Sequence, residues 1–299
     1  MAEDMQFVPR TQLLSLEEII RIGRGFVEMG VKKIRITGGE PLSRRNILTV
    51  FQELGALESL GELTLTTNAT RLPKYALGLY NAGVRRINVS LDSLRPDRYA
   101  RLTRVGNIKK AFDGLKAAED AGIERIKLNA VILKNRNEDE VLELVDYARE
   151  HDYDISFIEE MPLGEIGDHD RAESYYSSDQ ILRDLRRKHD LQSIPESTGG
   201  PSKYFQVPGD KTRVGFISPH SHNFCDTCNR VRLTAEGRLL LCLGQEYSKD
   251  LRQVLRTHPG DDEKLRRAII DSMNLKPQGH DFDLRSQVVL FRHMSHTGG

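Results

Sequence analysis

The feature that most constrains the fold of this chain is a unit that occurs three times, in which a helix ends at a glycine and a strand follows at once. The copies occupy residues 28–36, 81–89 and 120–128. Further strands are predicted at residues 62–68 and 154–158. Strands that alternate with helices are joined by right-handed crossovers into a parallel sheet. The sequence therefore predicts an α/β fold, with the sheet either rolled as a barrel or doubly wound.

The predicted strands alternate between apolar and polar residues, whereas parallel strands covered on both faces usually read as continuous apolar runs. One face carries Ile34, Ile36, Leu63, Leu65, Ile87, Val89, Leu91, Ile126 and Leu128. The other face carries Arg35, Thr37, Thr64, Thr66, Asn68, Asn88, Ser90, Asp92, Lys127 and Asn129. If helices cover the apolar face, the polar face lines an interior that holds a polar ligand. An open sheet with one face in water is the alternative.

The three cysteines of the chain are Cys225, Cys228 and Cys242, and all of them lie near the C-terminus. Charged and apolar residues alternate at 230–233, and a turn and an apolar run at 239–241 follow. This pattern predicts a β-hairpin. The hairpin returns Cys242 to the other two cysteines. Three thiolates are then expected to face one point in space.

This Cys-x2-Cys-x13-Cys spacing predicts a metal site. A zinc ion would need a fourth ligand, for which His220 and His222 are near enough in the sequence. A 4Fe-4S cluster held by three cysteines instead leaves one iron free to bind something else. The remaining interpretation is that the cysteines are small buried apolar residues.

Composition excludes several classes of protein. Lys plus Arg and Asp plus Glu both count 44, so the net charge is zero and nothing indicates a nucleic-acid or membrane partner. No segment resembles a transmembrane helix, and residues 1–4 lack the features of a signal peptide. An odd number of cysteines argues against a disulfide framework and predicts a cytoplasmic location.

The helix and strand rhythm ends beyond Pro162. A Ser/Pro/Gly-rich linker at residues 193–201 marks the expected domain boundary, which divides the chain into residues 1–192 and 193–299. The second unit is expected to hold strands around residues 204–205 and 213–217, the cysteine hairpin, and helices near Leu251 and Ala268.

Four motifs, taken in order, resemble the MoaA family. They are Thr37-Gly38-Gly39-Glu40-Pro41 after a predicted strand, Ser90-Leu91-Asp92, the three cysteines, and a terminal Gly298-Gly299. MoaA proteins are radical S-adenosylmethionine enzymes, the GTP 3′,8-cyclases that perform the first step of molybdenum cofactor biosynthesis. The resemblance covers nearly the whole chain. It implies a partial TIM-like barrel of parallel strands with a smaller α+β C-terminal iron–sulfur domain, which binds the cluster and the substrate.

The resemblance also implies which residues bind ligands. S-adenosylmethionine would be bound by Gly39, Ser90 and Met161. GTP would be bound by Arg35, Thr66, Lys127, Arg230 and Arg232. Cys225, Cys228 and Cys242 would hold a 4Fe-4S cluster whose open iron takes the guanine base, and the Gly298-Gly299 tail would reach the active site. Independently of the family, unpaired cations on an interior face are costly, and an anionic ligand would resolve the conflict.

The family also carries an N-terminal Cys-x3-Cys-x2-Cys loop. That loop binds a second 4Fe-4S cluster, which cleaves S-adenosylmethionine to the 5′-deoxyadenosyl radical. This chain has no cysteine before Cys225, and its first residues resemble the segment after that loop. We interpret the chain as starting downstream of the true start, so that the barrel lacks its first strand and residues 33–37 form an unpaired edge. A second departure is Ser156, where family members often carry arginine.

The leading hypothesis is a GTP 3′,8-cyclase, a lyase that joins the ribose C3′ of GTP to guanine C8 when the second 4Fe-4S cluster of a full-length chain is present. No residue is assigned to catalysis itself. The alternative is a non-catalytic remnant that binds one metal centre, 4Fe-4S or zinc, and a purine nucleotide. A third reading is a barrel enzyme that acts on a phosphorylated metabolite. The expected partners are GTP and the next enzyme of the molybdopterin pathway, and a homodimer is left open.

Overall fold

The structure is a computed structural model, and it describes residues 8–163, 169–245, 247–280 and 282. Its main body is an eight-stranded sheet in the order β1-β2-β3-β4-β5-β8-β7-β6. The strands are β1 (Lys33–Ile36), β2 (Glu62–Thr67), β3 (Arg86–Ser90), β4 (Arg125–Val131), β5 (Asp154–Ile158), β6 (Gln192–Ile194), β7 (Lys203–Gln206) and β8 (Arg213–Ile217). Strands β1 to β5 and β8 are parallel, and β7 and β6 continue the sheet in antiparallel pairs. The five parallel strands predicted from the sequence are confirmed.

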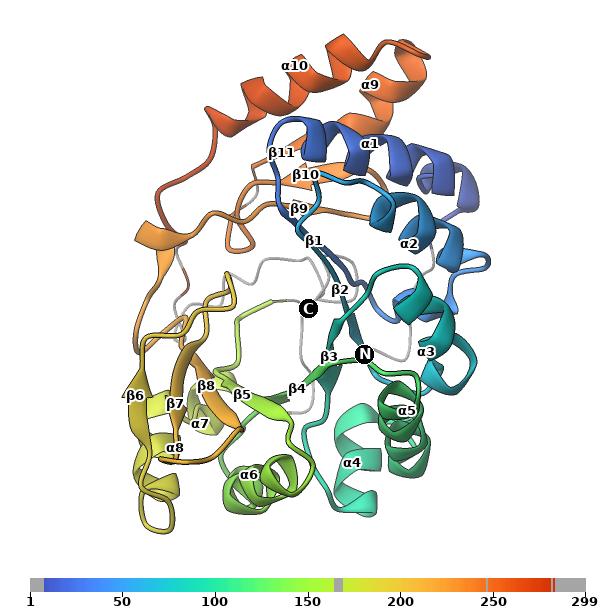
Figure 1. The fold of residues 1–299 in the computed structure, drawn as a ribbon. Helices are drawn as coiled ribbons and strands as arrows, with labels where there is room; N and C mark the ends of the chain where they lie inside the picture. Colours follow the sequence, from blue (N-terminus) through green and yellow to red (C-terminus); the bar gives the residue numbers. More distant parts are fainter. Residues whose placement is uncertain (1–7, 164–168, 246, 281, 283–299) are drawn as a thin grey trace.

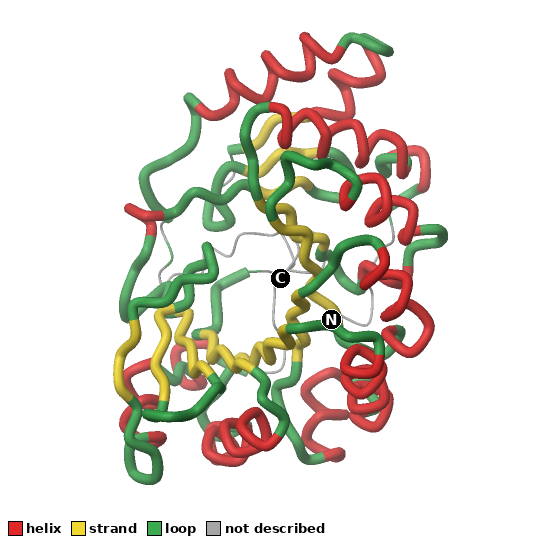
Figure 2. Tube along the Cα trace, viewed as in Figure 1, coloured by secondary structure: helices red, strands yellow, loops and turns green. Residues whose placement is uncertain are grey.

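Helices connect the parallel strands and cover the outer face of the sheet. They are α1 (Leu16–Glu28), α2 (Ile47–Gly55), α3 (Leu72–Asn81), α4 (Pro96–Thr103), α5 (Ile108–Asp120) and α6 (Val141–Glu150). The short helices α7 (Arg171–Ser174) and α8 (Ser178–Leu185) follow β5. Figure 1 shows the strands as an arc with these helices outside it, and Figure 2 shows the same separation by colour.

Each copy of the repeated unit is built by the same kind of helix end. Gly30, Gly83 and Gly122 come just after α1, α3 and α5 with φ values of 96°, 90° and 87°, a left-handed conformation that glycine adopts without steric penalty. The following residue bonds back to the last helical turn, as the Val31 N–H does to the Phe26 carbonyl at 3.0 Å. This Schellman arrangement ends the helix and turns the chain directly into the next strand.

The apolar residues of the strands face the helices. Leu65, Ile87, Val89 and Leu128 are fully buried in one core with apolar residues of α2, α3, α5 and α6. Burial of each such side chain stabilises the fold by about 1.5–3 kcal/mol. The polar residues between them point to the opposite, concave side of the sheet. The predicted two-faced strands are therefore confirmed.

The sheet is an open, partial barrel. Among the described residues, β1 and β6 are its outer strands, and β1 pairs only with β2. The arc in Figure 1 leaves these two strands apart. This matches the predicted fold class and the predicted edge at β1.

A second, three-stranded sheet contains the cysteine hairpin. Its elements and the helices after it are β9 (Arg232–Leu233), β10 (Arg238–Leu240), β11 (Ser248–Asp250), α9 (Leu251–Thr257) and α10 (Asp262–Met273). The antiparallel pairing of β9 with β10 confirms the predicted hairpin. Leu239 and Leu241 share a second core with Ile22 of α1, so this unit packs on the first helix. Within the described ranges, no helix has the length and apolar character needed to cross a membrane.

The strands expected at residues 204–205 and 213–217 do not belong to this smaller sheet. They form β7 and β8 of the main sheet, where β8 pairs with β5 in parallel. Val214 and Phe216 are buried in the same core as Phe157 of β5, so β8 extends the helix-covered face. The expectation that both strands belong to the C-terminal unit is therefore wrong. The division into residues 1–192 and 193–299 stays a prediction.

Candidate functional site

Positively charged residues gather on the polar face of the main sheet. Two rows in register across the strands are Arg35–Thr64–Arg86 and Thr66–Asn88–Lys127. Side chains in register on neighbouring strands point to the same side of a sheet. Arg35, Arg86 and Lys127 therefore line one region of the concave face, which we call the cationic patch.

Burial makes the charges of this patch act strongly on one another. Lys127 is 7% exposed, and burial, together with the charges of Arg35 and Arg86, lowers its pKa to about 7. Burial and the charges of Arg86 and Arg230 likewise lower the pKa of Arg35. Like charges held together away from water are unfavourable, and a bound anion relieves that repulsion.

Carboxylates neutralise the patch only in part. Glu62 of β2 pairs with Lys33 Nζ at 2.8 Å and with Arg86 Nη2 at 2.9 Å. The Nε atoms of Arg35 and Arg86 are buried and have no hydrogen-bond partner among the described residues. A guanidinium in this condition suits an acceptor with several oxygens, such as phosphate.

Arg230 and Arg232 extend the patch towards the cysteines. Burial, with the charges of Arg230 and Arg35, lowers the pKa of Arg232 to about 10, while Cys228 and Cys242 act in the opposite direction. Arg232 thus lies within electrostatic reach of both the main sheet and the thiols. The structure brings together the cations that were expected at GTP, and Thr66 lies in register with Asn88, beside Lys127 in the same row.

The three cysteines are free, partly exposed thiols. Cys225 begins the short helix η4 (Cys225–Thr227), and the Cys228 N–H donates to the Cys225 carbonyl at 2.9 Å. Burial, with a smaller contribution from the negative charges of Cys225 and Cys228, raises the pKa of Cys242, while the Gly244 N–H and the charge of Lys276 act in the opposite direction. The three thiols thus lie within electrostatic reach of one another, and their joint role as metal ligands stays a prediction.

The histidines considered as a fourth zinc ligand are engaged elsewhere. His220 Nε2 donates to the Glu160 carbonyl at 2.8 Å, and His222 Nε2 pairs with Asp179 at 2.9 Å. In the part of the chain that the structure describes, no three His, Cys, Asp or Glu side chains are placed to hold a metal ion, so the expected convergence on one point is not met. A 4Fe-4S cluster is wider, because each thiolate binds a different iron. A 4Fe-4S cluster at these three cysteines stays a prediction.

The residues expected at S-adenosylmethionine lie at the other end of the polar face. Gly39 follows β1, Ser90 ends β3 and Met161 follows β5. The carboxyl ends of parallel strands share one edge, which is where ligands of open α/β sheets bind. Asn129 is in register with Ser90, and its buried Oδ1 has no hydrogen-bond partner among the described residues. This acceptor fits a ligand that donates a hydrogen bond.

Glu40 holds the loop after β1 against β2. Its carboxylate accepts hydrogen bonds from the Leu42 N–H at 3.0 Å, the Asn68 N–H at 2.8 Å and the Thr67 hydroxyl at 2.9 Å. Bonds to a carboxylate are among the stronger hydrogen bonds of proteins. The position of Gly39 is therefore set by the side chain that follows it.

Ser156 of β5 places a hydroxyl, not a charge, on the polar face. It is fully buried, and its Oγ lies 3.0 Å from Ser202 Oγ. A Cβ atom at the neighbouring Gly215 would lie 2.2 Å from Ser202 Oγ, so this corner is closely packed. This serine pair occupies the position that the sequence analysis named as the second departure from the family pattern.

A cavity of about 190 Å³ lies beside Cys228. Its walls come from the linker and from the segment just before the hairpin strands, and they are Ser197, Gly199, Gly200, Pro201, Phe224, Thr227, Cys228, Asn229 and Arg230. The Thr198 carbonyl accepts a hydrogen bond from Lys33 Nζ at 2.6 Å. The linker is thereby tied to β1, next to the cationic patch.

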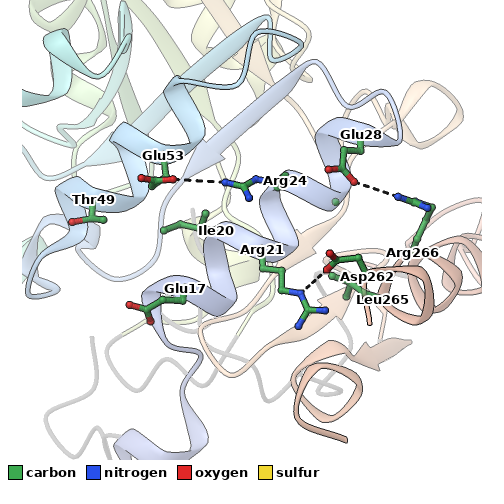
Figure 3. Close-up of a pocket in the computed structure, with 11 residues that line it drawn as sticks. Glu17, Ile20, Arg21, Arg24, Glu28, Thr49, Glu53, Asp262, Leu265 and Arg266 are labelled. Carbon is green, nitrogen blue, oxygen red and sulfur yellow. Dashed lines mark hydrogen bonds and ion pairs between the residues drawn. The ribbon is translucent and has the colours of Figure 1, made fainter. Parts of the chain in front are cut away.

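A larger groove of about 420 Å³ lies between α1, α2 and α10 (Figure 3). Ion pairs join its walls: Arg21–Asp262 at 2.6 Å, Arg24–Glu53 at 3.7 Å and Glu28–Arg266 at 3.3 Å. Each arginine here has a carboxylate partner, and none of the candidate ligand residues lines the groove. It is therefore separate from the candidate site.

Arg86 is the residue of this region that sequence reasoning missed. The polar alternation of Asn88, Ser90 and Asp92 reaches Arg86 when it is extended back by one step, so the signal was present. Gly298 and Gly299, expected to reach the active site, lie outside the described residues.

Two family models match most of the chain. The Radical SAM superfamily model matches residues 2–148, and the Molybdenum Cofactor Synthesis C model matches residues 153–282. The crystal structure of Streptococcus suis SuiB bound to S-adenosylmethionine aligns with a TM-score of 0.61 at 16% identity, over 88% of this chain and 62% of that one. At this identity the likeness concerns the fold alone. The fold and the family models define a radical SAM protein.

Curated relatives specify the family further. The GTP 3′,8-cyclases of Marinobacter nauticus and Pseudomonas entomophila are each 54% identical to this chain, and that of Saccharophagus degradans is 51% identical. Each match covers 100% of this chain and 90% of the relative. This chain belongs to the GTP 3′,8-cyclase (MoaA) family, as the sequence motifs implied.

Proposed function

We propose that this protein converts GTP to 3′,8-cyclo-7,8-dihydroGTP by a radical S-adenosylmethionine mechanism in molybdenum cofactor biosynthesis. Family membership supports the class of reaction. The observation that carries the proposal is the buried cationic patch of Arg35, Arg86 and Lys127 beside the cysteine hairpin. Such a patch is unfavourable unless an anion of several charges occupies it, and a triphosphate supplies that charge.

The triphosphate would be bound by cations from both sheets. The proposed contacts are Arg35, Arg86, Lys127, Arg230 and Arg232, with the hydroxyl of Thr66. Guanidinium groups match pairs of phosphate oxygens, whereas a lysine acts as a point charge. Lys127 lies centrally in the patch and would regain a full charge when the phosphates bind.

The guanine base would lie towards the hairpin. There, Cys225, Cys228 and Cys242 would hold a 4Fe-4S cluster whose open iron takes the base. Burial raises the pKa of the Cys228 thiol, but the Arg230 N–H and the charges of Arg230 and Lys276 outweigh it, so that the pKa is lower than usual. A lowered pKa favours the thiolate, which is the form that binds metal.

S-adenosylmethionine would bind at the carboxyl edge, at Gly39, Ser90 and Met161, where Asn129 offers its unpaired acceptor. When bound and cleaved at a second 4Fe-4S cluster, it supplies the 5′-deoxyadenosyl radical that takes a hydrogen from the ribose C3′. The polar face between the carboxyl edge and the hairpin would hold the ribose close to the S-adenosylmethionine, so that proximity contributes to the reaction.

Nucleotide binding without turnover is the second candidate function. The observation that favours it is the cysteine count, because the printed 299 residues hold only Cys225, Cys228 and Cys242. These three cysteines can serve as ligands of the one cluster proposed at the substrate, and none of the 299 residues then remains as a cysteine ligand for a second cluster. The rest of the site, including the cationic patch, is the same under both candidates.

One experiment separates the two candidates. The protein expressed from its gene in its own host is loaded with iron and sulfide without oxygen, and its intact mass is compared with 34.0 kDa. It is then incubated with GTP, S-adenosylmethionine and dithionite. Formation of 3′,8-cyclo-7,8-dihydroGTP, detected by mass spectrometry and lost in Cys225→Ala, supports the cyclase. GTP binding without product supports the binding function, and no GTP binding overturns both.

The setting of the reaction completes the proposal. The product would pass to the next enzyme of the molybdopterin pathway. The cytoplasmic location and the homodimer stay predictions.

A further inference from the structure

Lys276 joins the two parts of the chain that carry the hairpin cysteines. Its Nζ donates hydrogen bonds to the carbonyl oxygens of Arg230 at 2.9 Å and Leu241 at 2.7 Å. Arg230 follows Cys228 by two residues, and Leu241 directly precedes Cys242. A single ammonium group therefore fixes the separation of two thiol-bearing segments.

Among the described residues, the charge of Lys276 has no acidic partner. The Lys276 side chain is part-buried, and no described carboxylate lies within ion-pair distance of it. By contrast, most of the lysines that do form ion pairs in this protein are exposed. Backbone carbonyls satisfy its donors but carry no net charge. The two carbonyls that it bonds lie on the segments that carry Cys228 and Cys242, so its charge acts on both thiols.

We propose that Lys276 is a positioning residue for the iron–sulfur cluster of the hairpin. It holds Cys228 and Cys242 at the separation that a cluster requires, and its charge stabilises the anion that a 4Fe-4S core forms with three thiolates. This inference rests on the proposed function, because it takes the hairpin to bind a cluster. Nearby charge and hydrogen bonding are the means by which proteins tune cluster potentials.

Three variants test the proposal. Lys276→Met removes the hydrogen bonds and the charge, and Lys276→Gln keeps amide donors but loses the charge. Lys264→Met is the matched control, because Lys264 is an exposed residue of α10 that pairs with Asp261 and His258. Each protein is loaded with iron and sulfide without oxygen. Iron per chain, the visible spectrum and the midpoint potential of the cluster are then measured.

We expect Lys276→Met to hold less than half of the wild-type iron, and Lys264→Met to match the wild type. Lys276→Gln should keep more iron than Lys276→Met, with a more negative midpoint potential, because the reduced cluster carries more negative charge. Thermal unfolding of the iron-free proteins identifies a folding defect, and if Lys276→Met does not fold, the potential of Lys276→Gln decides.

Unchanged iron content and unchanged potential in the folded variants would overturn the inference and leave the proposed function standing. A wild-type protein that binds no iron would overturn both. Loss of iron with an unchanged unfolding temperature supports the inference. A purely structural lysine would not shift the potential of the iron that remains.

Discussion

Lys33 Nζ donates a hydrogen bond to the Thr198 carbonyl at 2.6 Å, although the two residues lie 165 positions apart. The same ammonium pairs with Glu62 of β2 at 2.8 Å. Lys33 therefore joins the edge of the main sheet to the linker that lines the cavity beside Cys228. This bond ties the edge strand of the main sheet to one wall of that cavity.

Replacement of Lys33 by methionine should release the linker. Loss of a part-buried charged hydrogen bond is expected to lower the free energy of unfolding by about 1–2 kcal/mol. Limited proteolysis should then cut within residues 195–201 several times faster. Lys32→Met is the control, because Lys32 bonds the Ser59 carbonyl at 3.3 Å on the exposed surface. Equal cleavage of the two variants would show that Lys33 does not hold the linker.

Arg86→Met should weaken GTP binding by about 10–100-fold, because a hydrogen bond to a charged group contributes about 1.5–3 kcal/mol. The neighbouring Arg85 serves as the control. Its guanidinium lies 3.9 Å over the Tyr80 ring, and it bonds the Tyr80 carbonyl, so Arg85→Met should bind GTP as the wild type does. Calorimetric titration of both variants makes the comparison. The same affinity in both would exclude Arg86 from the site.

GTP affinity should fall as the pH rises above 7. Burial, followed by Arg35 and Arg86, lowers the pKa of Lys127 to about 7, so above this pH the ligand-free amine is neutral and binding of an anion must add a proton. The fall is at most about tenfold per pH unit for one proton. Titrations in buffers of different ionisation enthalpy measure that proton. Lys127→Gln should bind more weakly and lose the proton uptake, and uptake that persists in it would contradict this assignment.

The same lowered pKa predicts how stability depends on pH in the ligand-free protein. Between about pH 7 and pH 10 the unfolded chain keeps a proton on Lys127 that the folded chain has lost. The free energy of unfolding contributed by this group therefore rises with pH across that window. It is lowest below pH 7, where the buried amine is charged. Urea unfolding of the wild type and Lys127→Gln at both ends of the window checks the sign, since the difference should shrink at high pH.

Glu40→Ala should disorganise the loop that carries Gly39. It leaves the Asn68 N–H and the Thr67 hydroxyl without their acceptor, which costs about 1–3 kcal/mol for each buried group left unpaired. S-adenosylmethionine affinity, measured by equilibrium dialysis, should fall several-fold. Glu53→Ala on α2 removes an exposed carboxylate that pairs with Arg24 at 3.7 Å and should leave the affinity unchanged. A similar affinity in both variants would separate Glu40 from cofactor binding.

Local signals were sufficient for most of the fold. The glycine that ends a helix in a left-handed conformation, as at Gly30, and the two-residue alternation in β3 both depend on neighbours in the sequence. The same alternation separated the polar face from the core and placed Arg35 and Lys127 on one side. These features could therefore be predicted without knowledge of the pairing order.

Long-range pairing could not be predicted in the same way. The pairing of β8 with β5 depends on the packing of Val214 and Phe216 in the core. No residue near them in the sequence specifies β5 as the partner strand. The bonds of Lys33 to Thr198 and of Lys276 to the hairpin carbonyls likewise join distant segments. The sequence motifs named candidate ligands for the site, but the supporting contacts that hold them became visible only in the structure.

The central claim is that the cationic patch and the cysteine hairpin bind one GTP molecule together. The most direct measurement is the GTP affinity of the iron-loaded protein, compared between the wild type and the single variants Arg35→Met and Arg232→Met. Arg35 belongs to β1 of the main sheet and Arg232 to β9 of the hairpin sheet. We predict that each substitution weakens binding at least about tenfold, as loss of a charged phosphate contact should. Wild-type affinity in either variant would contradict a site shared by the two sheets.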